Sequence, residues 1–264
     1  MPEPMLEIDT DLPAGALVDG PAHQLEERIA QAEGFWLQGR AGRFDRDDSG
    51  AVTAWHPRSG TLPATPTQPN KGDTRLTGWG DALGVQTTLG RHCGLVLPDV
   101  GQDVQAFSMA IIYRPDPVEE ARTLLTLNPR PGGGEAHSGG YLFISDLGDA
   151  LTVKDTGEAL SLTLPAEPAP RDPRLLIVTV AGNAMAVQRD SGVTHQVTGL
   201  APDLRGAADL FIGARSHRSG LQKTLGQALI LDVFFWPASR LLMPATADDA
   251  AQQAALMRYY HWVY

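Results

Sequence analysis

Short apolar runs alternate with turn-forming residues along most of the chain. Stretches rich in Val, Ile, Leu and Phe are separated by clusters of Gly, Pro, Asp, Asn and Ser, the residues that favour turns. Many short strands at such spacing are typical of a β-sandwich. The pattern predicts strands at 83–88, 93–97, 106–113, 122–127, 141–145, 150–154, 159–164, 174–181, 184–190, 193–197, 209–213 and 226–235.

Two segments have the period of a helix instead. Residues 21–33 start with a proline, carry Leu25 and Ile29 four positions apart, and stop at Gly34. Residues 246–260 offer Thr246 as an N-cap, with acidic residues in the first turn. The chain before the first helix is acidic and broken by prolines. We therefore divide the protein into an arm with a short helix (1–33) and a β domain (34–264), and we expect the core of that domain to be independent of the arm.

Residues 43–56, RFDRDDSGAVTAWH, resemble a calcium-binding loop at first sight. Asp45, Asp47 and Ser49 stand at the first, third and fifth positions of an EF-hand loop, and Gly50 stands at the sixth. The twelfth position, however, is His56 where a bidentate Glu is needed, and no helical pattern flanks the segment. The stretch is better interpreted as a turn that leads into a strand containing Trp55, and we predict no metal ion and no cofactor.

Composition narrows the function further. A formal net charge of -10 argues against nucleic-acid binding through a basic surface. Cys93 is the single cysteine, which excludes an internal disulfide framework. No apolar run reaches the roughly 20 residues that a membrane span needs, so we expect no membrane insertion. The acidic start is unlike a secretory signal peptide, and synthesis in a bacterial cytoplasm fits these features.

Several phrases, in order, carry a resemblance to a known family. They are FWLQGRAGRFDRDDSGAVTAWHPRSG (35–60), FSMAIIYRPD (107–116), PRLLIVTVAGNAMAVQRDSG (173–192), DLFIGARSHRSG (209–220) and LGQALILDVFFWPASRL (225–241). This order resembles the concanavalin A-like jelly roll of laminin G-type and legume-lectin-type domains. The resemblance implies an all-β jelly-roll sandwich, to which the patterns described above add a short N-terminal arm and helix and a C-terminal helix.

An enzymatic reading has one motif to offer. EIDTD (7–11) resembles the E-x-D-x-E strand of jelly-roll glucanases, and alternation would place Glu7, Asp9 and Asp11 on one face of a strand. Leu12-Pro13 follows at once, and the motif lies in the arm rather than in the middle of a sheet. The histidines are scattered, without metal-ligand spacing. We therefore predict no catalytic residues.

Sugar binding is the other chemistry that a lectin-like jelly roll suggests, because a flat aromatic ring covers the apolar face of a pyranose. Trp55 and Trp236 are expected in the core. Trp79, between glycines in RLTGWGDALG, is the candidate for an exposed stacking ring on a loop. In the loop RSHRSG, the side chains of Arg215, His217 and Arg218 could hold an acidic sugar, although a merely solvated loop is an open alternative.

Three functions stay open from the sequence. The first is a non-enzymatic spike, fibre or decoration protein of a tailed phage or a phage-derived gene transfer agent. In that reading the arm docks onto other particle proteins, the chain forms a homo-oligomer, and the jelly roll binds bacterial surface polysaccharide. The Ala-, Gly- and Arg-rich composition suits a high-GC bacterium. The second is a glycoside hydrolase or lyase on the same scaffold, and the third is an intracellular scaffold domain without a sugar ligand.

Overall fold

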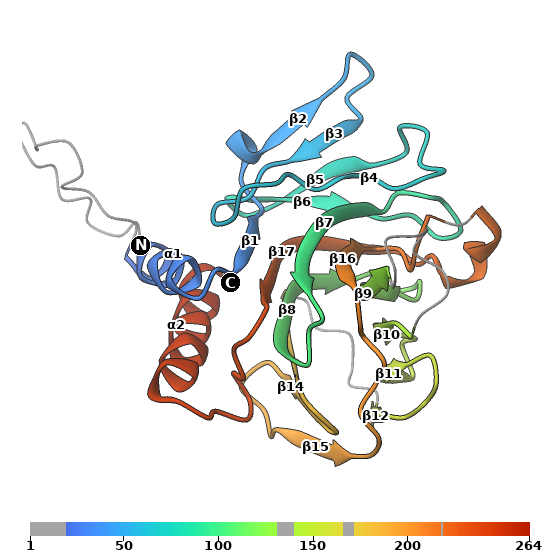
Figure 1. Ribbon diagram of the computed structural model, residues 1–264. Coiled ribbons are helices and arrows are strands. Elements are labelled where there is room, and N and C mark those ends of the chain that lie inside the picture. The colour runs from blue at the N-terminus through green and yellow to red at the C-terminus, as the bar shows by residue number, and fades with distance from the viewer. Residues whose placement is uncertain (1–19, 131–139, 166–171, 218) are drawn as a thin grey trace, which may run out of the picture.

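A computed structural model describes residues 20–130, 140–165, 172–217 and 219–264, and within them two antiparallel sheets pack face to face (Figure 1). We call them sheet I and sheet II. Sheet I has the order β15 (His195–Thr198), β14 (Ala184–Arg189), β13 (Arg174–Ala181), β8 (Ala106–Pro115), β17 (Ala228–Trp236), β6 (Ala82–Gln86) and β5 (Arg75–Trp79), and β1 (Phe35–Gln38) also pairs with β17. Sheet II has the order β12 (Ser161–Pro165), β11 (Ala150–Asp155), β10 (Leu142–Asp146), β9 (Arg122–Arg130), β16 (Ala207–Ile212), β7 (Leu95–Gln102) and β4 (Thr65–Pro66).

The central strands of sheet I are buried on both faces. Along β8, Met109 and Ile111 point into the core between the sheets, whereas Ala110 and Ile112 belong to a second apolar cluster on the outer side. This explains why β8 and β17 read as continuous apolar runs, while β11 alternates between buried and half-buried positions. The all-β sandwich predicted from the sequence is confirmed.

Two helices cover the outer face of sheet I. Figure 1 shows α1 (Pro21–Gln31) and α2 (Ala247–Val263) side by side against the β1–β17 region. Thr246 caps α2 as predicted, in a reciprocal capping box with Asp249. Neither helix is long and apolar enough to cross a membrane, and the same holds for the rest of the described chain.

The first helix is part of this layer. Leu25 and Ile29 are fully buried in one cluster with Trp36 and Tyr259. The expectation that the β domain has a core independent of residues 21–33 is therefore wrong, because α1 closes the outer cluster. The docking role of residues 1–33 stays a prediction.

The segment DRDDSG forms the turn between β2 (Phe44–Arg46) and β3 (Val52–Trp55), as predicted. One Asp47 oxygen accepts hydrogen bonds from the backbone N–H of Ser49 (2.9 Å) and of Ala51 (3.0 Å), which is the local bonding that makes Asp a turn residue. The Ser49 hydroxyl also donates to this oxygen (2.7 Å), and this bond, followed by the backbone bonds, holds the pKa of Asp47 below its usual value. The β2–β3 hairpin projects from the rest of the sandwich (Figure 1).

Some sequence-based expectations differ from the structure or fall outside its described part. Strand β5 was not predicted, because its half-exposed residues RLTGW lack an apolar run. The segment 57–75, rich in Pro, Thr and Gly, contains the short strand β4 and ends where β5 begins. The acidic motif at 7–11 and Arg218 lie outside the described residues, as does most of the glycine-rich sequence GGGEAHSGG (132–140).

Candidate functional site

Trp79 is the last residue of strand β5 and does not lie in a loop. It lies opposite Ala82 across a tight β5–β6 turn, in which Gly80 adopts a positive φ of 54°. The prediction of a loop position for Trp79 is therefore wrong, since the glycines around it belong to a hairpin. The ring packs at the margin of the outer cluster of sheet I and stays partly exposed. The guanidinium of Arg114 lies 4.5 Å from the ring centroid and covers part of it.

A second tryptophan faces the same hollow. Trp262, near the end of α2, exposes 54% of its surface, and together with Trp79 it lines a cavity of about 320 Å³. We call this cavity the tryptophan pocket; its lining residues are Arg40, Trp79, Gly80, Asp81, Ala82, Trp262 and Val263.

Hydrogen bonds between segments distant in sequence build the walls of the pocket. Arg40 Nη1 donates to the carbonyl oxygen of Asp81 (2.9 Å), and the backbone N–H of Leu83 donates to the carbonyl oxygen of Gly39 (2.9 Å). The β5–β6 hairpin is thereby fastened to the end of β1. The result is a polar and aromatic hollow, with two indole rings, one carboxylate and one guanidinium, which is the chemistry that suits a sugar ring and its hydroxyls.

Arg215 and His217, the two candidates of the RSHRSG loop that the structure describes, lie on the opposite side of the sandwich. On the outer face of sheet II, Phe143, Thr126 and Phe211 stand directly opposite one another on β10, β9 and β16. The Arg215 guanidinium stacks 3.8 Å from the Phe143 ring centroid, and the His217 ring meets Phe211 edge-on at 5.0 Å. The loop thus folds back over this face of the sheet.

The polar groups of this loop are largely engaged within the protein. Arg215 Nε donates to Thr123 Oγ1 (3.1 Å), its carbonyl oxygen accepts from Asn128 Nδ2 (3.1 Å), and His217 Nδ1 accepts from the backbone N–H of Gln68 (3.0 Å). Arg215 is half-buried as a result, whereas the His217 side chain stays exposed. These contacts indicate that Arg215 packs the outer face of sheet II.

The structure therefore does not bring the predicted sugar-binding residues together. Trp79 belongs to the outer face of sheet I, and Arg215 and His217 belong to the outer face of sheet II. Sequence reasoning missed Trp262 and Arg40 as partners of Trp79. A signal for Trp262 existed, because the buried positions of α2 follow the helical stripe 249, 252, 255–256 and 259, and position 262 falls beside that stripe.

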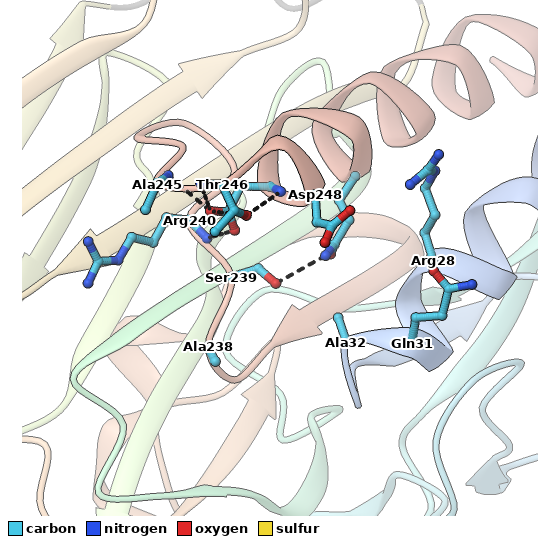
Figure 2. A pocket seen from close by; sticks show the side chains of 11 residues that line it. Arg28, Gln31, Ala32, Ala238, Ser239, Arg240, Ala245, Thr246 and Asp248 are labelled. Carbon is cyan, nitrogen blue, oxygen red and sulfur yellow. Dashed lines mark hydrogen bonds between the residues drawn. The ribbon is translucent and has the colours of Figure 1, made fainter.

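Other cavities offer less to a sugar. A hollow of about 430 Å³ lies between the end of α1, the 238–246 connection and the start of α2 (Figure 2). Figure 2 shows Ser239, Thr246 and Asp248 around it, and its described lining contains no aromatic ring. A third hollow, of about 330 Å³, lies at one end of the sandwich beside Val104 and Leu204. Among the described residues, no group of three or more His, Cys, Asp or Glu side chains is placed to hold a metal ion.

Comparison with known proteins supports the fold. No family model matches the chain, and no curated protein sequence matches it. Among solved structures, a sialidase from Trypanosoma rangeli bound to 2,3-difluorosialic acid aligns at a TM-score of 0.55 and 15% identity, over 85% of this chain and 33% of that one. Domain 4 of the GH43 extracellular arabinanase AbnA from Geobacillus stearothermophilus, in complex with arabinotriose, aligns at a TM-score of 0.51 and 15% identity, over 75% of this chain and 91% of that domain. The chain is thus similar to about a third of the sialidase and to most of the arabinanase domain.

The laminin resemblance is weaker in three dimensions. Domains LG4–5 of the mouse laminin α1 chain align at a TM-score of 0.43 and 14% identity, over 59% of this chain and 42% of that one. We draw no argument from a match with so low a TM-score. At such identities the likeness concerns the fold alone. The protein is an all-β sandwich of the jelly-roll kind, similar to folds found in carbohydrate-binding domains and glycoside hydrolases.

Proposed function

We propose that this protein binds a glycan without cleaving it, through the tryptophan pocket. The observation that carries the proposal is the pair Trp79 and Trp262, two partly exposed indole rings that line one hollow beside Asp81 and Arg40. Indole rings cover the apolar face of a pyranose, while a carboxylate and a guanidinium bond its hydroxyls.

The number of carboxylates in the pocket favours binding over hydrolysis. Glycosidases of the common types need two carboxyl groups, about 5 to 10 Å apart, on either side of the scissile bond. The described lining of the tryptophan pocket contains one carboxylate, that of Asp81. A glycoside hydrolase or lyase remains the alternative function, favoured by the similarity of the fold to glycosidases.

The finer part of the proposal concerns where the protein works. We place it in a spike, fibre or decoration structure of a phage-like particle, attached through residues 1–33. There it forms a homo-oligomer that binds bacterial surface polysaccharide. Support comes from the acidic arm before the jelly roll and from the Ala-, Gly- and Arg-rich composition. Several weak sugar sites on one particle would act together through avidity.

Binding measurements on pocket variants test the first part. Calorimetric titration of bacterial capsular and surface polysaccharides should show binding by the wild-type protein. Trp262→Ala and Trp79→Ala should each weaken it by about 5- to 30-fold, the effect of losing about 1–2 kcal/mol at an aromatic anchor. The exposed Val193, outside the pocket lining, supplies the control Val193→Ala, which should bind as the wild type does. Equal affinity of all four proteins would refute the assignment to the tryptophan pocket.

The particle role has its own test. Mass spectrometry of particles sedimented from supernatants of the source bacterium should detect this chain beside capsid or tail proteins. Its absence from such particles would leave the glycan-binding proposal standing and would refute the particle role.

A further inference from the structure

A buried carboxylate lies beneath the tryptophan pocket. Asp232, in the middle of β17, is completely buried in the outer layer of sheet I. Its Oδ1 accepts hydrogen bonds from the backbone N–H of Gly39 (2.8 Å) and from Trp36 Nε1 (3.4 Å). Its Oδ2 accepts from the hydroxyls of Tyr259 (2.7 Å) and Tyr264 (3.0 Å).

Stability alone is a poor explanation for this residue. The outer cluster around Asp232 is apolar and aromatic, and the four donors to its carboxylate are a backbone N–H, an indole N–H and two tyrosine hydroxyls, none of them charged. Desolvation raises the pKa of Asp232, in spite of the four donors. Because a buried charge is costly and a well-packed apolar side chain is often at least as stabilising, a buried acid of this kind points to a role in fixing geometry.

The four donors come from the segments that form the walls of the pocket. Arg40, which lines the pocket, directly follows Gly39. Trp262 and Val263, which line it from the other side, lie between Tyr259 and Tyr264. Asp232 thus ties the end of β1 and the last turn of α2 to the same two oxygen atoms.

The β5–β6 hairpin, which forms the third wall of the pocket, is bonded to Gly39 and Arg40 at the end of β1. The β5–β6 hairpin with Trp79 is held by the bond from the Leu83 N–H to the Gly39 carbonyl oxygen and by the bond from Arg40 to Asp81. Gly39 is packed so closely that a Cβ atom there would stand 2.3 Å from the Leu231 carbonyl oxygen and 2.6 Å from that of Leu83. The end of β1 therefore has little freedom to shift between the hairpin and β17.

We infer that Asp232 is the positioning residue of the tryptophan pocket, setting the separation of Trp79 and Trp262 through Gly39 and the two tyrosines. This inference rests on the proposed function for its consequence in glycan binding. Its structural half, that Asp232 orders the last turn of α2 and the end of β1, stands on the contacts alone.

Two substitutions of Asp232 distinguish the effect of its hydrogen bonds from the effect of its charge. Asp232→Asn keeps an acceptor for the Gly39 N–H and offers an amide group to the tyrosine hydroxyls, so we expect glycan affinity within about threefold of the wild type. Asp232→Leu removes all four acceptor contacts, and we expect affinity to fall by at least about tenfold. Asp209, a buried acid in sheet II that accepts from the Asp99 N–H and Arg130, supplies the matched control Asp209→Leu, which should leave glycan affinity unchanged.

Hydrogen exchange on the full chain provides a readout independent of any glycan. Asp232→Leu should speed amide exchange at residues 39–40 and 258–264 more than elsewhere, and Asp232→Asn should restore protection there. If Asp232→Leu does not fold, Tyr264→Phe, which removes one donor, should show the same local effect at 260–264. Unchanged exchange in these segments, or a loss of protection spread evenly over both sheets, overturns the inference. A wild-type protein that binds no glycan would refute the proposed function, while the exchange data would still decide the role of Asp232.

Discussion

The contribution of α1 to stability can be predicted from the burial of one leucine. Leu25 is completely buried between the helix layer and sheet I, in a cluster that also holds Ile29, Trp36 and Leu256. Leu25→Ala removes most of that side chain and leaves a cavity that the surrounding β-sheet cannot easily close. Substitutions of this kind cost about 2–5 kcal/mol. We expect a loss of about 3 kcal/mol in the free energy of unfolding, a large share of the roughly 5–15 kcal/mol that holds a typical domain together.

Urea unfolding followed by circular dichroism measures this loss, from the transition midpoint and slope of each protein. In thermal unfolding the same change corresponds to a fall of roughly 6–12 °C in the midpoint, at about 2–4 °C per kcal/mol for a chain of this size. Gln24, exposed on the same helix, provides the control Gln24→Ala, for which we expect a change within about 0.5 kcal/mol. A loss below about 1 kcal/mol for Leu25→Ala would show that α1 is not part of the core. By the same reasoning, a chain starting at Gly34 should be severely destabilised, because Leu25 and Ile29 are both lost and the outer cluster is uncovered.

Three further predictions concern pH, calcium and catalysis. Burial raises the pKa of Asp232, so its contribution to stability is complete below the unfolded pKa of about 3.9 and is lost as pH rises through the higher folded pKa. Urea unfolding at pH 4 and pH 7 should therefore show the wild type losing stability, relative to Asp232→Asn, as pH rises. A gain of wild-type stability relative to Asp232→Asn over this range would contradict the prediction. Chelator should leave the melting temperature within about a degree, because the DRDDSG turn bonds to itself and has His56 in place of the bidentate Glu; a shift of several degrees with millimolar calcium would reveal a site. Incubation with polysaccharides should release no reducing sugar above a buffer control, whereas release that disappears in Asp81→Asn would establish the glycosidase alternative.

Much of the architecture was accessible from local sequence. Strand β13 was predicted at its observed bounds, since a continuous run of β-branched and leucine residues followed by Gly182-Asn183 specifies a strand and its turn without distant contacts. The start of helix α2 could also be predicted from local sequence, because the Thr246 cap forms its hydrogen bonds within the first turn. The DRDDSG turn belongs to the same class, with Asp47 bonding two to four residues ahead.

The candidate site depends instead on contacts between distant parts of the chain. Trp79 and Trp262 line one pocket because the β5–β6 hairpin and the end of α2 both meet the end of β1, and no local pattern encodes that meeting. Asp232 looks in sequence like a polar interruption of an apolar strand. Only tertiary packing brings four hydrogen-bond donors to it, two from β1 and the residue after it and two from the end of α2. Local bonding and side-chain periodicity determined the elements, whereas the burial of both faces of sheet I decided which side chains became core and which became a pocket.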